Sequence, residues 1–514
     1  MAEAVIQFSE TKNGEKTCSC NGKFLHSKYN PKAEAQRFAQ TIEADFEPQC
    51  IFMLEPALSY CAEFVRERFP KANLYAIRFT DEFFGTDKLW DKIFYADENL
   101  DDEIFNFLGE EKICSSIFVD WSASRNAFPE ESEIAWKKIR NAVLKSRNVM
   151  TTRSYFSKRW LKNSAIFASN VKNICALDTE SSSHRKTSFP IVIAASGTSL
   201  FSSIAKIKEN RSRFFLVAVS SAFMTLMENG IAPDFVISTD GGYWAKSHLH
   251  FPLSKNAGIP IALSTESAAP KETERTKPII PLLYDDATSF QKKILERLNI
   301  KAAKARRNGT VSGTALELAL DMTDGAIFLC GLDQAPAKGF QHTQPNALEE
   351  NSAKSDFRLN TKETRLTSSR FNSGQSLEIY RNWFKANSKK FNTPKERVFR
   401  LSDDFKFDFD LGSIRDVNWN EFDKILEKLS GNEKPEEKIR IGKSENIEFG
   451  RDERKKIILE ELEKALSDEK FLDEVFPMDI LILKRERNPE KKIALTEKLE
   501  EKKQNLISEI ESII

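Results

Sequence analysis

The chain has 514 residues, long enough for several domains, and its 77 Lys and Arg residues balance its 77 Asp and Glu residues. This balance excludes the strong positive field that is typical of proteins that bind nucleic acid or anionic membranes. We expect neither a membrane span, because no apolar run reaches roughly 18–20 residues, nor a signal peptide. Seven scattered cysteines favour reduced thiols and a cytoplasmic location.

Residues 1–180 are predicted to form an N-terminal α/β domain with connecting helices. After a polar start, the apolar pattern predicts strands over 50–54, 74–79 and 113–121 and helices over 32–44, 58–69, 102–109 and 131–171. Strands that alternate with helices in this way indicate a small parallel sheet. The polar segment 179–186 is typical of a linker.

Residues 185–412 are predicted to form a central domain, and its first strand is the most informative stretch of the chain. Residues 191–195 are uncharged and β-branched at three positions, as in a strand covered on both faces. A Ser-Gly-Thr-Ser turn follows, and Leu200, Ile204 and Ile207 then mark one face of a helix. Further strands are expected over 214–219, 235–238, 260–264, 279–283, 326–330 and 398–401, and helices over 222–229 and from 315 onward.

Residues 416–514 are predicted to form a C-terminal helical domain. Phe422 and Ile425 recur at helical spacing, and Leu499, Leu506 and Ile513 recur every seven residues. One helix of a bundle is favoured here over a coiled-coil dimer, and the sequence gives no prediction of the oligomeric state.

Several small polar turns are expected where ligands bind in a parallel sheet, outside the carboxyl ends of its strands. They are Ser196–Ser199, Ser220-Ser221, Asp240–Gly242 and Gly331–Asp333, and Ser312–Thr314 lies at the start of a helix. Their backbone N–H groups, hydroxyls and carboxylates suit the ribose and phosphate of a nucleotide, because helix starts attract anions. The alternative is that these turns are ordinary loops of an α/β sheet.

Among the histidines, His342 is the candidate for proton transfer, because it follows the turn at Gly331. Its imidazole can take a proton from an attacking hydroxyl near neutral pH. The alternative is a solvated loop histidine. His248 and His250 have no third ligand at metal spacing and are predicted to be surface residues, and His26 is predicted to have a structural or interaction role.

Three segments resemble the motility accessory factor (Maf) family of bacterial flagellin glycosyltransferases. The first is the strand and turn at 191–200, and the second leads from Ala218-Val219-Ser220-Ser221 to Asn229-Gly230-Ile231-Ala232-Pro233-Asp234, the most specific motif. The third joins Ser312-Gly313-Thr314-Ala315 to Gly331-Leu332-Asp333 and His342. Together with the N-terminal Phe24-Leu25-His26-Ser27-Lys28-Tyr29-Asn30-Pro31, the resemblance covers residues 24 to about 410.

The resemblance implies both a fold and a reaction. The family is distantly similar to bacterial sialyltransferases that use a CMP-activated sugar acid. The expected fold is a Rossmann-like central glycosyltransferase domain between an N-terminal α/β domain and a C-terminal helical domain. The implied enzyme moves a nonulosonic acid of the pseudaminic or legionaminic type from CMP onto Ser or Thr of flagellin, and so supports flagellar assembly and motility.

Carried onto this chain, the resemblance implies two sets of residues. The donor-binding set is Ser196, Gly197, Thr198, Ser199, Ser220, Ser221, Asp240, Gly241, Ser312, Gly313, Thr314 and Gly331. The catalytic set is His342 and Asp333. We expect direct displacement at the anomeric carbon, with the phosphate charge of CMP held by turn N–H groups. No cofactor is expected beyond the CMP-sugar donor; a divalent metal is not required, although Asp240 and Asp333 could hold one.

Some positions depart from the family pattern. Ala195, Ser196 and Thr198 stand where the relatives often carry Gly, Asn and Pro, so backbone groups rather than a side-chain amide would hold the phosphate. The related sialyltransferases carry their base histidine later, where residues 370–374 contain none, so His342 stands in for it. Residues 54–60 replace a Gly-rich turn, and the N-terminal domain is therefore not expected to bind a nucleotide.

Two other functions stay open. The chain could be a pyrophosphokinase that acts on hydroxymethylpterin, since archaeal enzymes of that kind share the central motifs, although they lack large flanking domains and need clustered carboxylates for Mg-ATP. It could also be a non-catalytic accessory protein that binds flagellin.

Overall fold

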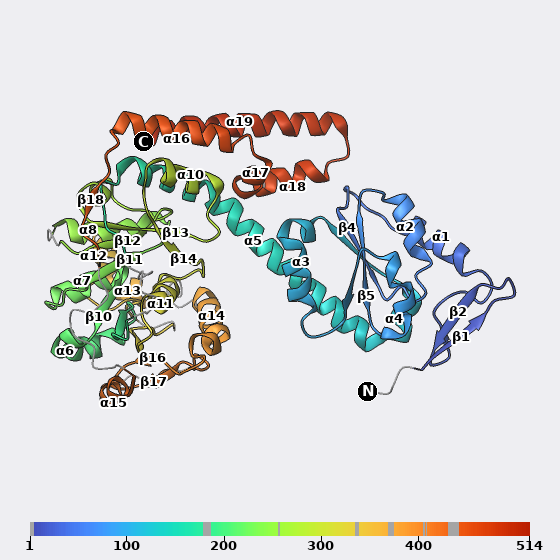
Figure 1. Cartoon of the computed structure of the whole chain (residues 1–514), viewed down its shortest axis with the longest axis horizontal. Coiled ribbons are helices and arrows are strands. Elements are labelled where there is room, and N and C mark those ends of the chain that lie inside the picture. Colours follow the sequence, from blue (N-terminus) through green and yellow to red (C-terminus); the bar gives the residue numbers. More distant parts are fainter. Residues whose placement is uncertain are drawn as a thin grey trace. The chain divides into compact units, whose positions relative to one another are not determined.

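The computed structural model describes residues 5–177, 187–254, 258–334, 339–367, 375–403, 407, 409–429 and 441–514. Contacts divide the chain into two compact units (Figure 1). Unit 1 comprises Met1–Ser157 and Asp468–Asn505, and unit 2 comprises Lys158–Ser467 and Leu506–Ile514. Three domains were expected from the sequence, at 1–180, 185–412 and 416–514, and these bounds remain a prediction. The two compact units have different bounds. The predicted linker at 179–186 lies outside the described residues, and so does the segment 370–374, where the related sialyltransferases carry their base histidine.

Unit 1 is built on a four-stranded parallel sheet with helices on both faces. The strands, in the order β6-β5-β4-β7, are β4 (Cys50–Leu54), β5 (Asn73–Arg78), β6 (Lys92–Tyr95) and β7 (Ser116–Asp120). Ile51 and Met53 of β4 pack on one face of the sheet, and Cys50, Phe52 and Leu54 pack on the other, as the alternation of a strand requires. The predicted strands at 50–54, 74–79 and 113–121 are thus confirmed.

Unit 1 also contains helical elements outside this sheet. They are α1 (Pro31–Thr41), α2 (Cys61–Arg68), η1 (Asp81–Leu89), α3 (Leu100–Cys114), α4 (Ser122–Ala127), the first part of α5 (Pro129–Asn170), α17 (Glu469–Val475), α18 (Pro477–Arg485) and most of α19 (Pro489–Ile513). A small antiparallel sheet of β1 (Ile6–Glu10), β2 (Lys16–Cys20) and β3 (Lys23–Phe24) precedes them. The sequence did not predict this sheet, because β1 is largely exposed and polar.

The chain's own side chains fill the carboxyl end of the unit 1 sheet. Glu55, just after β4, is fully buried and forms an ion pair with Arg78 at the end of β5, with 2.9 Å between Oε1 and Nη1. The Leu58 N–H donates to His26 Nε2 at 3.0 Å. The His26 ring lies 5.3 Å from the Tyr60 ring and 5.1 Å from the Trp121 ring, measured between centroids. His26 is therefore a buried structural residue next to the point where the strand order reverses, between β4 and β7.

Unit 2 is built on an eleven-stranded sheet in the order β17-β16-β15-β9-β10-β11-β12-β13-β8-β18, with β14 also paired to β13. The strands are β8 (Asn173–Ile174), β9 (Ile191–Ala194), β10 (Phe215–Val219), β11 (Phe235–Ser238), β12 (Ile261–Ser264), β13 (Ile279–Tyr284), β14 (Ala303–Ala305), β15 (Ile327–Cys330), β16 (Val398–Leu401), β17 (Arg415–Val417) and β18 (Glu445–Asn446). Within the described residues, the strands of this sheet pair in parallel except β18 with β8. The strand predicted at 191–195 and the six further strands predicted for the central domain are confirmed.

The topology of this sheet defines where a ligand would bind. From β9 the chain moves outward through β10, β11, β12 and β13, and it then crosses to β15, β16 and β17 on the other side of β9. The strand order therefore reverses between β9 and β15, and the crevice outside their carboxyl ends is the expected ligand position in an open parallel sheet. The polar turns expected from the sequence follow β9, β10, β11 and β15 at this edge.

Unit 2 also contains helices (Figure 1). They are α6 (Leu200–Glu209), α7 (Ser220–Glu228), α8 (Lys246–Ser254), α9 (Lys271–Thr276), α10 (Ser289–Arg297), α11 (Val311–Met322), α12 (Ala347–Ala353), α13 (Lys362–Thr367), α14 (Gln375–Phe391), α15 (Trp419–Leu429) and α16 (Arg451–Ala465). Of these, α6, α7, α11, α14 and α15 contribute side chains to the core around the sheet. Trp419 and Phe422 of α15 pack in the core of the sheet, so this first helix of the third predicted block belongs to unit 2. Within the described residues, no helix combines the length and apolar character needed to cross a membrane.

Candidate functional site

The predicted turn Ser196–Ser199 closes on a carboxylate of the chain itself. Oδ2 of Asp333, which follows β15, accepts from Thr198 Oγ1 at 3.0 Å and from the Ser199 N–H at 2.9 Å. The Ser199 hydroxyl donates to Oδ1 of the same carboxylate. Ser199 and Asp333 are both buried. The start of α6 therefore already holds a negative charge, at the position where the sequence predicts the donor's phosphate.

Two glycines make this closure possible. The Gly197 N–H donates to the Gly331 carbonyl oxygen at 2.8 Å. A Cβ on Gly197 would lie 2.5 Å from Asp333 Cγ, and a Cβ on Gly331 would lie 2.3 Å from the Ala195 carbonyl oxygen. Gly331 also has a φ of +74°, a backbone conformation that favours glycine. The turn after β9 and the turn after β15 thus form one compact structure at the point where the strand order reverses.

A second set of predicted residues meets beside this turn. His342 Nδ1 lies 3.0 Å from Ser196 Oγ, and Ser221 Oγ donates to Ser196 Oγ at 2.8 Å. The Asn346 side-chain amide donates to the Ser221 carbonyl at 2.8 Å, and the Thr343 N–H donates to the Ser196 carbonyl at 2.8 Å. The carboxyl ends of β9 and β10 and the segment after β15 therefore converge on His342.

The surroundings of His342 keep its ring neutral near pH 7. Burial lowers the pKa of His342, and hydrogen bonding to the Ser196 backbone offsets part of that effect. Nδ1 lies 3.0 Å from Ser196 Oγ, where it donates if it carries the ring proton and accepts if it does not. In the tautomer with the proton on Nδ1, Nε2 on the other side of the ring keeps its lone pair and can accept a proton.

A cavity of about 460 Å³ lies beside His342. It is lined by Trp244, Gly339, Phe340, Gln341, His342, Gln344, Asn346, Leu348, Glu349, Asn351, Ser352, Ser355, Arg365 and Leu366. Its volume is within the range of small-molecule sites. Apart from His342, the lining residues were not singled out from the sequence, because α12 and α13 carry no motif that points to a ligand.

His248 was predicted to be a surface residue, and this prediction is wrong. Its side chain is buried in α8, and its ring centroid lies 6.4 Å from that of His342. Burial, with a smaller contribution from His342, lowers the pKa of His248 to about 4. The prediction rested on the lack of a third ligand at metal spacing, which says nothing about burial, and His248 is in fact followed by the fully buried Leu249. His250 is exposed, as predicted.

Asp240 and Gly241 lie farther along the same edge, at the end of β11. The exposed Asp240 accepts from the Gly242 N–H at 2.7 Å through Oδ1. Gly241 is buried, and its carbonyl oxygen accepts from the side-chain amide of Asn163 in α5 at 3.3 Å. A Cβ on Gly241 would lie 3.0 Å from Trp160 Cδ1. The part of α5 that belongs to unit 2 therefore supports this turn, although the sequence assigned the whole helix to the N-terminal domain.

Arg307 is a residue of this region that sequence reasoning missed. It follows β14, and its guanidinium lies 4.3 Å from the ring centroids of both Trp160 and Tyr284. It also forms ion pairs of 2.9 Å with the buried Glu266 and with Asp286. The only signal in the sequence is the pair Arg306-Arg307 before the turn at Asn308, and β14 itself was not predicted.

The predicted turn Ser312–Thr314 forms the first turn of α11. Ser312, Gly313 and Thr314 are buried, and no side chain caps this helix start. Asn308 Oδ1 accepts from the Thr310 N–H at 3.2 Å. Burial raises the pKa of Tyr284, and the neighbouring hydroxyls of Thr239 and Thr314 offset part of this effect. Tyr284 thus connects the end of β11 with the start of α11.

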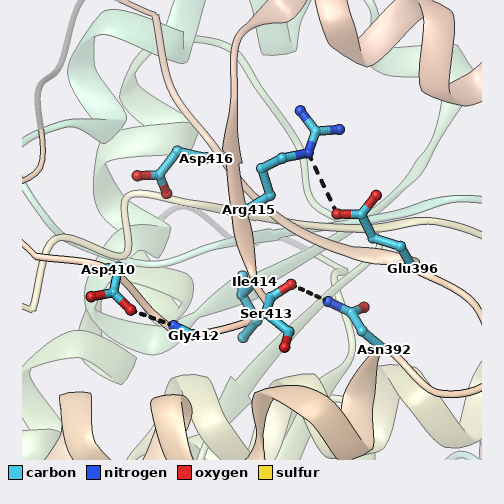
Figure 2. Close-up of a pocket in the computed structure, with 8 residues that line it drawn as sticks. All are labelled: Asn392, Glu396, Asp410, Gly412, Ser413, Ile414, Arg415 and Asp416. Atoms are coloured by element: carbon cyan, nitrogen blue, oxygen red, sulfur yellow. Dashed lines mark hydrogen bonds and ion pairs between the residues drawn. The ribbon is translucent and has the colours of Figure 1, made fainter.

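A second hollow lies at the opposite end of the strands. Its volume is about 520 Å³. Figure 2 shows the residues that line it, which are Asn392, Glu396, Asp410, Gly412, Ser413, Ile414, Arg415 and Asp416. Arg415 and Asp416 begin β17, and Glu396 precedes β16, so the cavity lies at the amino ends of these parallel strands. Its walls are held by local bonds, such as the one from the Asn392 amide to the Ser413 carbonyl at 2.6 Å. Ligands of parallel sheets bind at the carboxyl ends, so this hollow is not the candidate site.

Within the part of the chain that the structure describes, no three His, Cys, Asp or Glu side chains are grouped so that they could hold a metal ion. Asp240 and Asp333, the two carboxylates that the sequence offered for a metal, have separate partners. Asp240 bonds to the Gly242 N–H, and Asp333 bonds to the Ser196–Ser199 turn.

Comparison with known proteins supports this fold. Residues 158–339 match the model of the family "6-hydroxymethylpterin diphosphokinase MptE-like". The structure of the Maf glycosyltransferase from Magnetospirillum magneticum AMB-1 superposes with a TM-score of 0.58 and 13% identity, over 98% of this chain and 91% of that one. The chain therefore has the α/β fold of this Maf glycosyltransferase over nearly its whole length, which confirms the resemblance and the fold class expected from the sequence.

Two proteins of Treponema pallidum (strain Nichols), both described as uncharacterized, are also similar. The first is 30% identical over 306 residues, which is 58% of this chain and 62% of that protein. The second is 26% identical over 157 residues, which is 29% of this chain and 70% of that protein. The match thus spans less than two thirds of the first relative's length.

Proposed function

We propose that the chain is a glycosyltransferase that moves a nonulosonic acid of the pseudaminic or legionaminic type from CMP onto Ser or Thr hydroxyls of flagellin, in support of flagellar assembly and motility. The observation that carries this proposal is the likeness to the Maf glycosyltransferase fold over 98% of the chain. The convergence of Ser196, Ser221 and His342 where the strand order reverses supports it. All seven cysteines are free thiols, which supports the cytoplasm as the site of the reaction.

His342 is the proposed base. The acceptor hydroxyl oxygen forms a bond to the anomeric carbon, and the bond from that carbon to the phosphate oxygen breaks. CMP leaves with the electron pair, and the hydroxyl proton passes to His342 Nε2. Ser196 orients the ring, and Ser221 holds Ser196.

The start of α11 is the proposed position of the phosphate. At α6, Asp333 already bonds the Ser199 N–H, and a second anion there would be repelled. The first turn of α11 has no side-chain cap, so its N–H groups are available for an anion. Asp333 therefore acts by shaping the turn after β9, while Ser220, Ser221 and Asp240 line the cytidine and sugar side.

The family model that matches 158–339 supports a second candidate, a hydroxymethylpterin pyrophosphokinase. This match covers the middle of the chain, whereas the Maf likeness extends over both units. We therefore prefer the glycosyltransferase. A non-catalytic accessory protein that binds flagellin is the third candidate.

Calorimetric titration of the full chain with CMP and with ATP separates the first two candidates. The glycosyltransferase proposal expects CMP to bind and ATP to bind at least tenfold more weakly; the reverse order overturns it. Ser312→Asp places a negative charge at the start of α11 and should weaken CMP binding at least tenfold. The same change at the exposed Ser202 of α6 should leave CMP binding unchanged. Unchanged flagellin mass in a strain that lacks this chain would exclude the transferase and leave the accessory role.

A further inference from the structure

We propose that Asp240 and Tyr380 form the ribose subsite of the donor site, and that they recognise the hydroxyls that distinguish a ribonucleotide from a deoxyribonucleotide. This inference rests on the proposed transfer from a CMP-sugar, and it assigns one part of that donor to two side chains. Asp240 follows β11. Tyr380 belongs to α14, a helix in which the sequence gave no sign of a ligand site.

The ring of Tyr380 lies against the loop that leads into α11. A Cβ on Gly309 would lie 3.8 Å from Tyr380 Cε1, which is ordinary van der Waals contact. Gly309 directly precedes Thr310, the N-cap residue of α11. The next residue of α14, Arg381, donates from Nη1 to the carbonyl oxygen of Gln334, which follows β15, at 3.2 Å. This part of α14 therefore lies at the carboxyl edge of the sheet, beside the helix start that is proposed for the phosphate.

The turn that carries Asp240 lies beside the same loop. A Cβ on Gly241 would lie 3.0 Å from Trp160 Cδ1, and the Trp160 ring centroid lies 4.3 Å from the guanidinium of Arg307, in the loop between β14 and α11. Burial raises the pKa of Tyr380, and the negative charge of the nearby Asp240 raises it further. The tyrosine hydroxyl is therefore protonated at neutral pH, and it lies close to a carboxylate.

Both side chains have hydrogen-bonding capacity left for a ligand. Asp240 is exposed, and its Oδ1 accepts from the Gly242 N–H at 2.7 Å. Among the residues that the structure describes, neither Oδ2 of Asp240 nor the Tyr380 hydroxyl has a hydrogen-bond partner. Arg307 is already paired with two other carboxylates. The two side chains thus offer a carboxylate oxygen that can only accept and a hydroxyl that can donate or accept.

These groups favour the ribose over the other parts of the donor. A carboxylate repels the phosphate and the sugar's own carboxylate, and it binds groups that donate a hydrogen bond. Ribose hydroxyls are such groups, and in nucleotide-binding parallel sheets an acidic residue commonly accepts from them. The cytosine amino group also donates, but it lies at the far end of the base, whereas the ribose is joined directly to the phosphate. Because Tyr380 contacts Gly309 beside the start of α11, the ribose is the donor group next to it.

Calorimetric titration of the full chain with CMP, 2′-deoxy-CMP and UMP tests this subsite. The wild-type chain should bind CMP at least tenfold more tightly than 2′-deoxy-CMP, because a hydroxyl bonded to a carboxylate is lost. Asp240→Asn and Tyr380→Phe should each reduce this preference to threefold or less. The preference is the quantity to compare, because a change of charge or a distortion of the turn alters both affinities alike. Glu378→Gln and Ile379→Ala change exposed side chains of the same helix and should keep the wild-type preference.

The other outcomes are also decisive. Equal binding of CMP and 2′-deoxy-CMP by the wild-type chain, or an unchanged preference in both variants, overturns the subsite and leaves the proposed function standing. A change in only one variant overturns the assignment of the other residue. If Asp240→Asn alters the preference for CMP over UMP and not the preference for CMP over 2′-deoxy-CMP, the carboxylate binds the base and the ribose assignment is wrong. If the wild-type chain binds no CMP, the proposed function fails, and the inference fails with it.

Discussion

At the scale of single residues, Asp333 takes the place that a bound anion would take. Helix starts in ligand-binding turns usually offer free N–H groups to a phosphate. Here the Asp333 carboxylate accepts from the Ser199 N–H and from two hydroxyls of the same turn. A carboxylate with this many donors is a structural group, and it makes the turn after β9 rigid whether or not a ligand is present.

Asp333→Asn should therefore destabilise the protein. An amide has one acceptor oxygen in place of two, and its NH₂ group would face donors, so at least one buried donor loses its partner. The expected loss is about 1–3 kcal/mol in the free energy of unfolding, measured from the midpoint of urea unfolding. Asp423→Asn, which breaks the exposed ion pair with Arg213, is the control and should cost less than about 1 kcal/mol. Equal midpoints for both variants would mean that water bonds the donors of the turn that the amide leaves without a partner.

His342→Gln tests the proposed base. Glutamine is similar in size and can still bond Ser196, but it cannot accept the hydroxyl proton. We expect kcat for transfer to fall by about 10²–10⁴-fold, with CMP affinity unchanged. Retention of wild-type kcat would exclude His342 as the base.

The pH profile of the wild-type enzyme gives the same hypothesis a second test. The base must be neutral to act, and burial lowers the pKa of His342 below its usual value of 6.5. Activity should therefore persist below pH 6.5 and be lost only as the pH falls through the lowered pKa. An acidic limb centred above pH 6.5 would contradict this assignment.

At the scale of elements, strands were predictable where the sequence is apolar throughout. β4, β11 and β16 have the ends expected from their uncharged or mostly apolar runs. β14 and β17 were missed, because each has three residues and includes charged side chains such as Lys304 and Arg415. Two or three hydrogen-bonded residues at the side of a sheet take their conformation from the neighbouring strand and leave little signal of their own.

The candidate site was predictable in position and not in detail. Turns after buried strands could be assigned to one edge, because all carboxyl ends of a parallel sheet lie together. The bond between Ser199 and Asp333, 134 residues apart, and the stacking of Arg307 on Trp160 depend on how distant segments pack. No local pattern contains that information, and for this reason the sequence left the Asp333 carboxylate free to act on a ligand.

α9 carries a buried carboxyl group, Glu274, that should make the free energy of unfolding depend on pH. Glu274 is fully buried next to the end of α5, and burial raises its pKa from 4.5 to about 8. The folded state therefore binds this proton more tightly than the unfolded state. The resulting stability is fully present below pH 4.5 and is lost as the pH rises to about 8, at about 1.4 kcal/mol per pH unit for this group.

Glu274→Gln should remove this dependence. The neutral amide resembles the protonated acid, so variant and wild type should have similar urea midpoints at pH 4.5. At pH 8.5 the variant should be the more stable of the two. A difference that stays constant between these pH values would mean that Glu274 is ionised throughout, with its charge held by Lys271 and Arg275.

At the scale of the whole molecule, the chain contains two parallel sheets, each with a point where the strand order reverses. In unit 1 this point is occupied by the chain itself, through His26 and the buried pair of Glu55 and Arg78. Removing either charge of such a pair would leave the other unpaired in the interior, at a cost of about 3–5 kcal/mol. In unit 2 the corresponding edge has an uncapped helix start and a cavity. The two sheets therefore should not respond alike to a nucleotide.

Hydrogen exchange of the full chain with and without CMP measures this difference. CMP should slow exchange in unit 2, at the starts of α7 and α11 and in residues 339–346, because the ligand orders these segments or bonds their N–H groups. Residues 54–60 of unit 1 should exchange at the same rate in both samples, because the Leu58 N–H is already bonded to His26 and the adjacent Glu55 is buried in its pair with Arg78. Slower exchange at 54–60 on addition of CMP would mean that the nucleotide displaces His26, and the assignment of unit 1 as a closed sheet would then be wrong.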